Sequence, residues 1–324
     1  MTSAECVEQP RATEHEMRDG EQRTARRAIT ARALLLVAAL GAMPLAPAHG
    51  QADSTSSSVP LFTYRDVGLA GAFALGAYLV RPLDDHYARR LQDSSTQANR
   101  KLQTLSVFVR TTAAPGSWII GTTMYATGRV FKNEHLAELG LHGTEALLIG
   151  EAIGVVMKGT FGRQRPFVKP MNPHNYSFLR GFSGGDQYRS FPSGHTLAAF
   201  AAAASVSSET ARWWPNTRWV IGPAMYGGAT LVAVSRMYDN RHWASDVIAG
   251  AGIGTFAGLK VVRFNRSNPG NRIDAWLLTG SITPTPDGGH ALRWLILPGV
   301  GLGRPQMVQV PRLAPLARDD IALR

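Results

Sequence analysis

The chain has 324 residues and a formal net charge of +11, and its mean hydropathy is −0.09. The positive charge favours anionic partners, but no groove-reading motif and no basic stripe interleaved with aromatics accompanies it, so we do not expect nucleic acid as a partner. The only cysteine, Cys6, lies near the start of the chain, which excludes a disulfide framework.

The first 48 residues are predicted to form a signal peptide. Three arginines between residues 26 and 32 precede an uncharged run that ends in Ala-Pro-Ala at residues 46–48, in the order basic region, apolar region and small-residue cleavage site. The apolar run is short of the ~20 residues that a membrane span needs, which favours cleavage over a first membrane anchor. Residues 49–60, rich in Ser, Asp, Ala and Gln, are predicted to be a flexible linker.

Residues 61–262 are predicted to form one mainly α-helical domain. Five uncharged segments and one mixed segment are long enough to be helices. These are residues 67–80, 111–128, 145–157, 190–208, 219–235 and 247–259. A six-helix bundle follows, and the three motifs described next fall at helix ends, so we expect them to meet at one pole.

The first motif is the run Lys-Gly-Thr-Phe-Gly-Arg-Gln-Arg-Pro at residues 158–166. Lys158 and Arg165 supply fixed positive charges, and a guanidinium binds two oxygens of a phosphoryl group at once. Alone, this spacing is a weak signal, because a basic loop at a helix end is usually solvated. The Pro-, Gly- and aromatic-rich residues 167–189 that follow are predicted to be an ordered loop over a pocket mouth, with a plain surface loop as the alternative.

The second motif is Pro-Ser-Gly-His at residues 192–195, ahead of an alanine-rich run of high helix propensity. Ser193 is predicted to be the N-cap, and Gly194 lets the chain approach a ligand closely. The free amides of the first turn then point at an anion. His195 is placed to donate a proton to a departing oxygen.

The third motif contains Ser235, Arg236, His242 and Asp246. Because His242 and Asp246 are four residues apart, we expect them one turn above another on a single helix face. The carboxylate then fixes the imidazole tautomer and makes His242 a nucleophile, while Arg236 adds a third cation to Lys158 and Arg165.

A stripe of small residues continues from the third motif. Steps of four from Asp246 reach Gly250, Gly254 and Gly258, which predicts that another helix packs closely there. Each glycine costs about 1 kcal/mol relative to alanine in a helix, so the stripe requires a packing reason.

The last part of the chain, residues 263–324, is predicted to be an accessory tail. Residues 276–283 and 291–297 are strand-like and flank Pro-Thr-Pro-Asp-Gly-Gly, which indicates a small β-hairpin.

Neither a metal nor a cofactor is expected. The remaining histidines considered as ligands lack metal-ligand spacing and are predicted to be surface or loop residues. They are His86, His135, His142 and His174.

The three motifs in this order resemble the signature of the PAP2 (type 2 phosphatidic acid phosphatase / vanadium haloperoxidase) superfamily, over about residues 145–260. The resemblance implies a metal-independent phosphatase that acts on phosphate monoesters or diphosphates, lipid-linked or small, through a phosphohistidine. It implies His242 as nucleophile, Asp246 as its orienting partner and His195 as acid and base. The residues implied to bind phosphate are Lys158, Arg165, Ser193, Gly194 and Arg236.

Two other functions are weighed against the phosphatase. The residues implied to bind phosphate would also bind vanadate, so a vanadium-dependent haloperoxidase is one alternative. Those enzymes are usually much longer chains. A non-catalytic helical protein that binds phosphate or lipid is the other, and the complete set of histidines and carboxylate disfavours it. The substrate is left open between a lipid phosphate, a prenyl diphosphate and a small ester. The placement is left open between a soluble periplasmic bundle and one at the outer face of the inner membrane.

Overall fold

The computed structural model describes residues 61–268 and 271 and two short strands. The long helices are α2 (Tyr64–Val80), α5 (Arg100–Thr111), α6 (Ser117–Val130), α7 (Glu134–Phe161), α9 (Gly194–Trp213), α10 (Ile221–Tyr238) and α11 (Ala244–Ser267). The short helices are α3 (Asp84–Leu91), α4 (Ser94–Gln97) and α8 (Arg180–Ser183). Further single turns are Arg81–Leu83, Thr112–Gly116, Asp186–Tyr188 and Pro215–Trp219.

The chain divides into two units after Ser267. In the second unit, β1 (Ser281–Pro284) pairs antiparallel with β2 (His290–Arg293). Most of the predicted tail, and all of the predicted signal peptide and linker (1–60), lie outside the described residues. The first unit is mainly α-helical and has no strand within residues 61–268.

Each of the six predicted helices overlaps a helix of the structure, but the prediction of only six was wrong. The described part of the chain contains a further long helix, α5, which packs against α10. It was missed because Arg100, Lys101 and Arg110 make it too polar to be found among uncharged segments. Its start is set locally by Asn99, whose side chain accepts bonds from the amides of Lys101 and Leu102.

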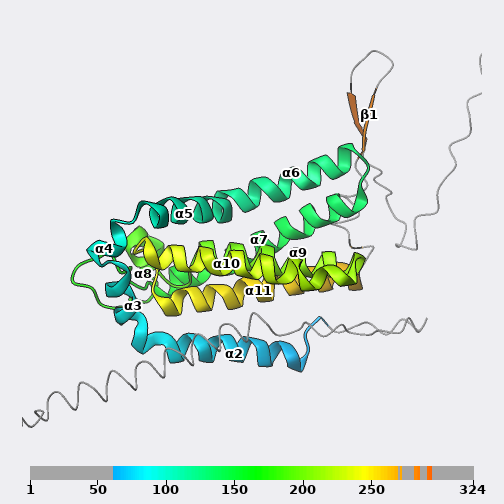
Figure 1. Cartoon of the computed structure of the whole chain (residues 1–324). Coiled ribbons are helices and arrows are strands. Elements are labelled where there is room, and N and C mark those ends of the chain that lie inside the picture. Colours follow the sequence, from blue (N-terminus) through cyan, green and yellow to red (C-terminus); the bar gives the residue numbers. More distant parts are fainter. Residues whose placement is uncertain (1–60, 269–270, 272–280, 285–289, 294–324) are drawn as a thin grey trace, which may run out of the picture. The chain divides into compact units, whose positions relative to one another are not determined.

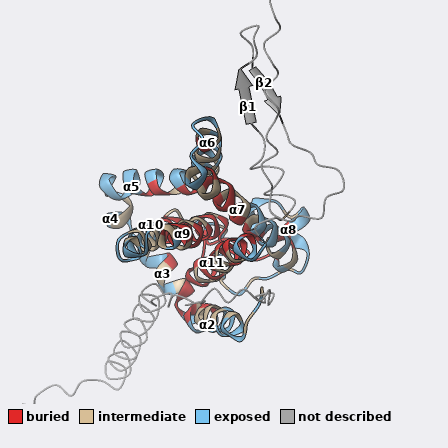
Figure 2. Ribbon diagram, turned by 90° about the vertical axis from the view of Figure 1, so that its right-hand side faces the viewer, coloured by how far each residue is buried: buried red, intermediate tan, exposed pale blue. Residues whose placement is uncertain are grey.

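The central helix of the first unit is α9. It packs against α7, α10 and α11, while α2 lies on α11 and α6 on α7. Figure 2 shows the buried residues concentrated on α9 and α11, with exposed residues on the outer helices. The alanine-rich sequence of α9 suits this position, because small side chains let three neighbouring helices approach at once.

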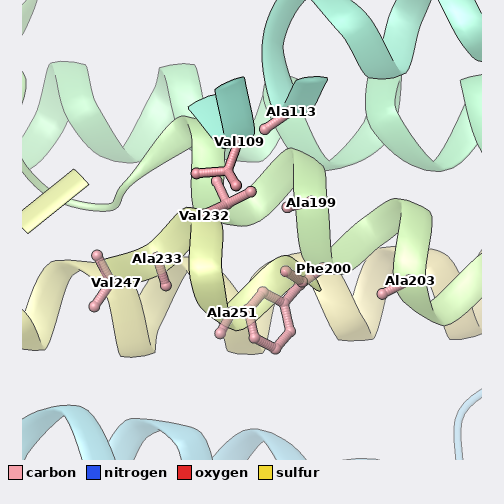
Figure 3. Close-up of a cluster of buried hydrophobic side chains, with 10 residues drawn as sticks. Val109, Ala113, Ala199, Phe200, Ala203, Val232, Ala233, Val247 and Ala251 are labelled. Carbon is pink, nitrogen blue, oxygen red and sulfur yellow. The ribbon is translucent and has the colours of Figure 1, made fainter. Parts of the chain in front are cut away.

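One cluster of buried apolar side chains fills the space between α5, α9, α10 and α11 (Figure 3). Its members are Val109, Ala113, Ala199, Phe200, Ala203, Ala229, Val232, Ala233, Val247 and Ala251. All except Phe200 are alanine or valine, which lets the helices approach closely at this cluster.

The glycine stripe of α11 packs directly on α9, as predicted. A Cβ at Gly250 would lie 2.6 Å from the carbonyl oxygen of Ser193, and a Cβ at Gly254 would lie 2.2 Å from that of Leu197. At Gly258 the nearest atom is the carbonyl oxygen of Ala201, at 2.6 Å. All three contacts are with backbone, which cannot give way as a side-chain end does, so only glycine fits.

The helix directions bring four ends together at one pole. The chain leaves α7 and α10 there and enters α9 and α11, and α3, α4 and α8 lie at the same pole (Figure 1). Two of the described helices, α7 and α11, are long and apolar enough to cross a membrane, judged by length and composition.

The substitution Gly254→Ala tests the packing of α11 on α9. We expect it to destabilise the protein by about 1–3 kcal/mol, because the new methyl group forces the two backbones apart. Gly227→Ala is the matched control, since nothing lies within 4 Å of a Cβ at that exposed position of α10. The control should gain up to about 1 kcal/mol from helix propensity. Thermal unfolding midpoints measure both, and equal midpoints for the two variants would contradict the packing argument.

Candidate active site

The first motif leaves α7 through a tight turn at Gly162. This residue caps the helix with a left-handed backbone, φ 50° and ψ 42°, and its amide bonds the carbonyl of Lys158. A Cβ there would lie 2.0 Å from the carbonyl oxygen of Ser177, so glycine is required on steric grounds as well. The turn keeps Lys158 on the helix and sends Arg163 and Arg165 across the pole.

The second motif forms the N-terminus of α9, with Ser193 at the N-cap as predicted. Its hydroxyl, however, pairs with the Thr196 hydroxyl at 2.9 Å and caps no backbone amide. Among the described residues, the first-turn amides of Gly194, His195 and Thr196 therefore have no hydrogen-bond acceptor. Free amides at the positive end of a helix dipole favour an anion.

Lys158 lies next to these amides. A Cβ at Gly194 would come within 2.5 Å of the Lys158 ammonium nitrogen and 3.5 Å of both Glu151 carboxylate oxygens. Within the described chain, no hydrogen bond or ion pair of the Lys158 ammonium is formed. Gly194 is thus needed to leave room for this cation beside the helix end.

Arg236 is a second cation with unused hydrogen-bonding capacity. It lies in the last turn of α10 and is 5% exposed. One of its terminal nitrogens donates to Asp239 at 2.8 Å, and Asp239 in turn accepts from the Ser106 hydroxyl at 2.7 Å. Its Nε is buried and finds no partner in the part of the chain that the structure describes. A buried N–H group without an acceptor is costly, which indicates a place for a ligand oxygen.

Arg165, in contrast, is already engaged. Its Nε donates to the carbonyl of Asp186 at 2.9 Å and its Nη2 to the Asp186 carboxylate at 2.7 Å. Asp186 also bonds Arg241 at 3.2 Å. The predicted ordered loop, 167–189, therefore reaches one of the predicted phosphate cations and places a carboxylate on it.

His242 does not lie on a helix, so the predicted geometry of the His242–Asp246 pair was wrong. α11 begins at Ala244, and His242 lies in the turn before it. Its Nδ1 lies 2.7 Å from the carbonyl oxygen of Ser190 and 3.7 Å from the nearer oxygen of Asp246. A carbonyl oxygen can only accept, so Nδ1 carries the proton and Nε2 keeps its lone pair.

Burial and the nearby cations favour the neutral form of both imidazoles. Burial, together with the charges of Arg236, Lys158 and Arg165, lowers the pKa of His195 to about 4. Burial lowers the pKa of His242 to about 3, against the opposing effect of Asp246. The cations act on both rings, so the structure brings the three motifs into one electrostatic site.

Three residues that the sequence analysis did not identify join the motifs behind His242. The buried Arg163 guanidinium donates to the Asp246 carboxylate at 2.5 Å and to the Asp84 carboxylate at 2.7 Å. The Ser190 hydroxyl donates to the other Asp246 oxygen at 2.5 Å. Arg163 lies inside the first motif and Ser190 just before the second, so their positions in the sequence could have identified them as site residues. Asp84 is about 80 residues from Arg163, and nothing in the sequence marks it.

The interpretation of His142 as a surface or loop residue was wrong. His142 lies within α7, is 3% exposed and bonds the fully buried Glu209 at 2.9 Å. His86, His135 and His174 are exposed, as expected. Within the described residues, no group of three His, Cys, Asp or Glu side chains is arranged to hold a metal ion.

These features define a class of protein: a helical bundle whose pole carries cations, free amides and two imidazoles, an arrangement that suits an anion with several oxygens. Residues 141–269 of the chain match the family model of the PAP2 superfamily.

Individual relatives are distant. The chain is 29% identical over 243 residues to the lipid A 1-phosphatase of Porphyromonas gingivalis, covering 69% of this chain and 48% of that protein. It thus spans about half the length of that relative. It is 28% identical over 176 residues to the undecaprenyl-diphosphatase of Sulfolobus acidocaldarius, covering 54% of this chain and 77% of that protein.

Two solved structures are also similar. One is the transmembrane PAP2 type phosphatidylglycerolphosphate phosphatase from Bacillus subtilis, at 20% identity and TM-score 0.49, covering 65% of this chain and 99% of that one. The other is Aquifex aeolicus LpxE, at 24% identity and TM-score 0.39, covering 56% of this chain and 95% of that one.

The substitution Gly194→Ala tests the anion site without removing a charge. We expect inorganic phosphate to bind about tenfold more weakly, because the methyl group displaces the Lys158 ammonium from the helix end. Gly143→Ala is the control, since nothing lies within 4 Å of a Cβ at that position of α7. Isothermal titration with phosphate measures both, and an unchanged affinity in Gly194→Ala would contradict the site.

Proposed function

We propose that this protein is a metal-independent lipid phosphate phosphatase that cleaves a phosphate monoester or diphosphate through a phosphohistidine at His242. One observation carries the proposal: unfilled donors surround the two imidazoles. These donors are the α9 amides, the Lys158 ammonium and the Arg236 Nε. An anion with several oxygens satisfies all of them at once.

In the first step, the Nε2 lone pair of His242 forms a bond to phosphorus. The bond from phosphorus to the leaving oxygen breaks, its electron pair stays on that oxygen, and the His195 imidazolium gives it a proton. Lys158 and Arg236 stabilise the charge on the non-bridging oxygens, which is the largest catalytic contribution available to such a site. Arg165 joins them when the phosphate displaces the Asp186 carboxylate.

In the second step, water attacks the phosphorus of the phosphohistidine. His195, now neutral, takes a proton from the water, and the electrons of the nitrogen–phosphorus bond return to Nε2. Phosphate leaves, and His195 is again protonated for the next leaving group. The site needs no metal for either step, because its cations are all side chains.

The outer surface supports a lipid as substrate and a membrane as location. On α7, large apolar side chains are exposed, with Leu148 61%, Val155 58% and Val156 59% exposed. Further exposed apolar residues lie on α2, which packs on α11, and on α6, which packs on α7: Leu75, Leu79, Ile119, Ile120 and Val130. We infer that α7 and α11 span the membrane and that this surface contacts lipid.

Aromatic residues at both ends of the bundle fit the same placement. Trp214 and Trp219 are exposed where α9 ends, and Phe178 and Phe182 are exposed at the pole of the site. Aromatic side chains favour the two interfaces of a bilayer. The site then lies at headgroup level, where a lipid phosphate is found. The curated relatives are named for action on lipid A and undecaprenyl diphosphate, which agrees with this substrate class.

His242→Ala is the direct test. We expect phosphate release from a prenyl diphosphate or a phosphatidate in detergent to fall by at least about a thousandfold, because the nucleophile is lost. Wild-type turnover should persist in EDTA, and rapid quenching in alkali should trap labelled phosphate on the wild-type protein only. His86→Ala, at an exposed histidine, is the control. Turnover that survives in His242→Ala would overturn the mechanism.

The pH dependence of turnover tests the assignment of the two histidines. His242 must be neutral and His195 protonated, so kcat/KM of the free protein should have an acidic optimum and fall as pH rises above about 4, the pKa of His195. The bound phosphate offsets the cations and raises that pKa, so the basic limb of kcat should lie at higher pH. Arg236→Gln should shift the basic limb of kcat/KM upward, since it removes one of the charges that lower the pKa. A downward shift would contradict the assignment.

A further inference from the structure

A buried ionic cluster lies next to His242, whose Nδ1 is 3.7 Å from the Asp246 carboxylate. Arg163, Asp84 and Asp246 are each 0% exposed. The Arg163 guanidinium bonds one oxygen of Asp84 at 2.7 Å and one of Asp246 at 2.5 Å. The three groups come from α3, the first motif and α11, so the cluster joins distant parts of the chain.

Both carboxylates of the cluster are ionised, because every hydrogen-bond partner donates to them. Asp84 accepts from the Ser245 amide at 2.8 Å, the Ser245 hydroxyl at 2.6 Å and Arg163. Asp246 accepts from Arg163, the Ser190 hydroxyl and the Trp243 amide, the last at 2.9 Å. The amides and the guanidinium can only donate, and each serine hydroxyl is oriented to donate as well.

The cluster therefore has one net negative charge, two carboxylates against one guanidinium. The nearby Arg81 does not neutralise it: this side chain faces the Tyr176 ring and His174, and forms no ion pair with Asp84 or Asp246 in the described chain.

Stability alone does not account for Asp84. Burial raises its pKa, and Arg163 and the Ser245 bonds only partly oppose this, so the ionised group is held at a net cost. A buried ion pair is also weak evidence for stability, because apolar residues of similar volume often do as well. Asp84 therefore requires a role other than stabilising the fold. His242 lies next to the cluster and changes its charge in the proposed reaction.

We propose that Asp84 is a positioning residue that supplies the excess negative charge for phosphorylation of His242. The inference rests on the proposed phosphohistidine. When Nε2 bonds phosphorus and Nδ1 keeps its proton, the ring becomes a cation. The positive charge of Arg163 cancels the negative charge of Asp246. The negative charge of Asp84 is then left to compensate the positive charge of the phosphorylated ring. It acts through Arg163 and Ser245 and touches no reacting atom.

The test compares vanadate with inorganic phosphate as ligands of Asp84→Asn. Vanadium accepts Nε2 of His242 as a fifth ligand, which makes the ring a cation. Inorganic phosphate forms no bond to Nε2 and contacts only the phosphate-binding cations and amides. We expect vanadate affinity to fall on the order of tenfold while phosphate affinity changes less than about twofold. In turnover, kcat should fall by a similar factor with KM nearly unchanged.

Three variants separate charge from structure. Glu209→Gln removes another fully buried carboxylate, at the opposite end of α9, and should leave the vanadate-to-phosphate ratio unchanged. Asp84→Glu and Ser245→Ala disturb the contacts but keep the charge, so both should retain the ratio even where the unfolding midpoint falls. If Asp84→Asn does not fold, the proposal is overturned when Asp84→Glu or Ser245→Ala lowers the ratio of vanadate affinity to phosphate affinity.

The ligand measurements also distinguish this inference from the proposed function. A wild-type protein that prefers vanadate but releases no phosphate would refute the phosphatase and still test Asp84. Equal vanadate-to-phosphate ratios in the wild-type protein and Asp84→Asn would refute the role of Asp84, whatever the wild-type protein hydrolyses.

Discussion

The buried carboxylate of Asp246 is the group on which the arrangement of the site depends. Its oxygens accept from the Arg163 guanidinium, the Ser190 hydroxyl and the Trp243 amide, and its backbone carbonyl accepts from the Ser193 amide at 3.1 Å. These donors come from the three regions of the chain that carry the motifs. Displacing any of them would leave a buried polar group unsatisfied, so the carboxylate holds the three helix ends in one geometry.

Close helix packing supplies the second half of this constraint. Gly250 lies one turn after Asp246 on α11, and a Cβ there would meet the carbonyl oxygen of Ser193 at 2.6 Å. The stripe of glycines thus begins directly beside the N-cap of α9, the helix end that offers its amides to an anion. The distance between α9 and α11 therefore sets the position of the first-turn amides of α9.

Sequence reasoning found the elements that are coded locally and missed those that are not. The alanine-rich α9 and the glycine stripe follow from composition and period, and the motif cations and histidines follow from chemistry. The helix at α5 was missed because its charge hid it, and His242 was placed on a helix because spacing alone does not show where a helix begins. Asp84 was out of reach, since it meets Ser245 only through the tertiary fold, 161 residues away along the chain.

The site separates charge across one imidazole. The charges of Arg165 and Arg236 act on His242, and at its Nδ1 lies Asp246, which belongs to a cluster of two carboxylates and one guanidinium. In the proposed mechanism the ring becomes a cation when Nε2 bonds phosphorus, and the nearby carboxylates stabilise that cation. Because buried groups and helix ends are fixed, the main reorganisation that the proposed reaction needs is the displacement of Asp186 from Arg165. A solvated ring would lose this advantage, so the proposed mechanism gives a reason for the 4% exposure of His242 despite the low pKa that burial causes.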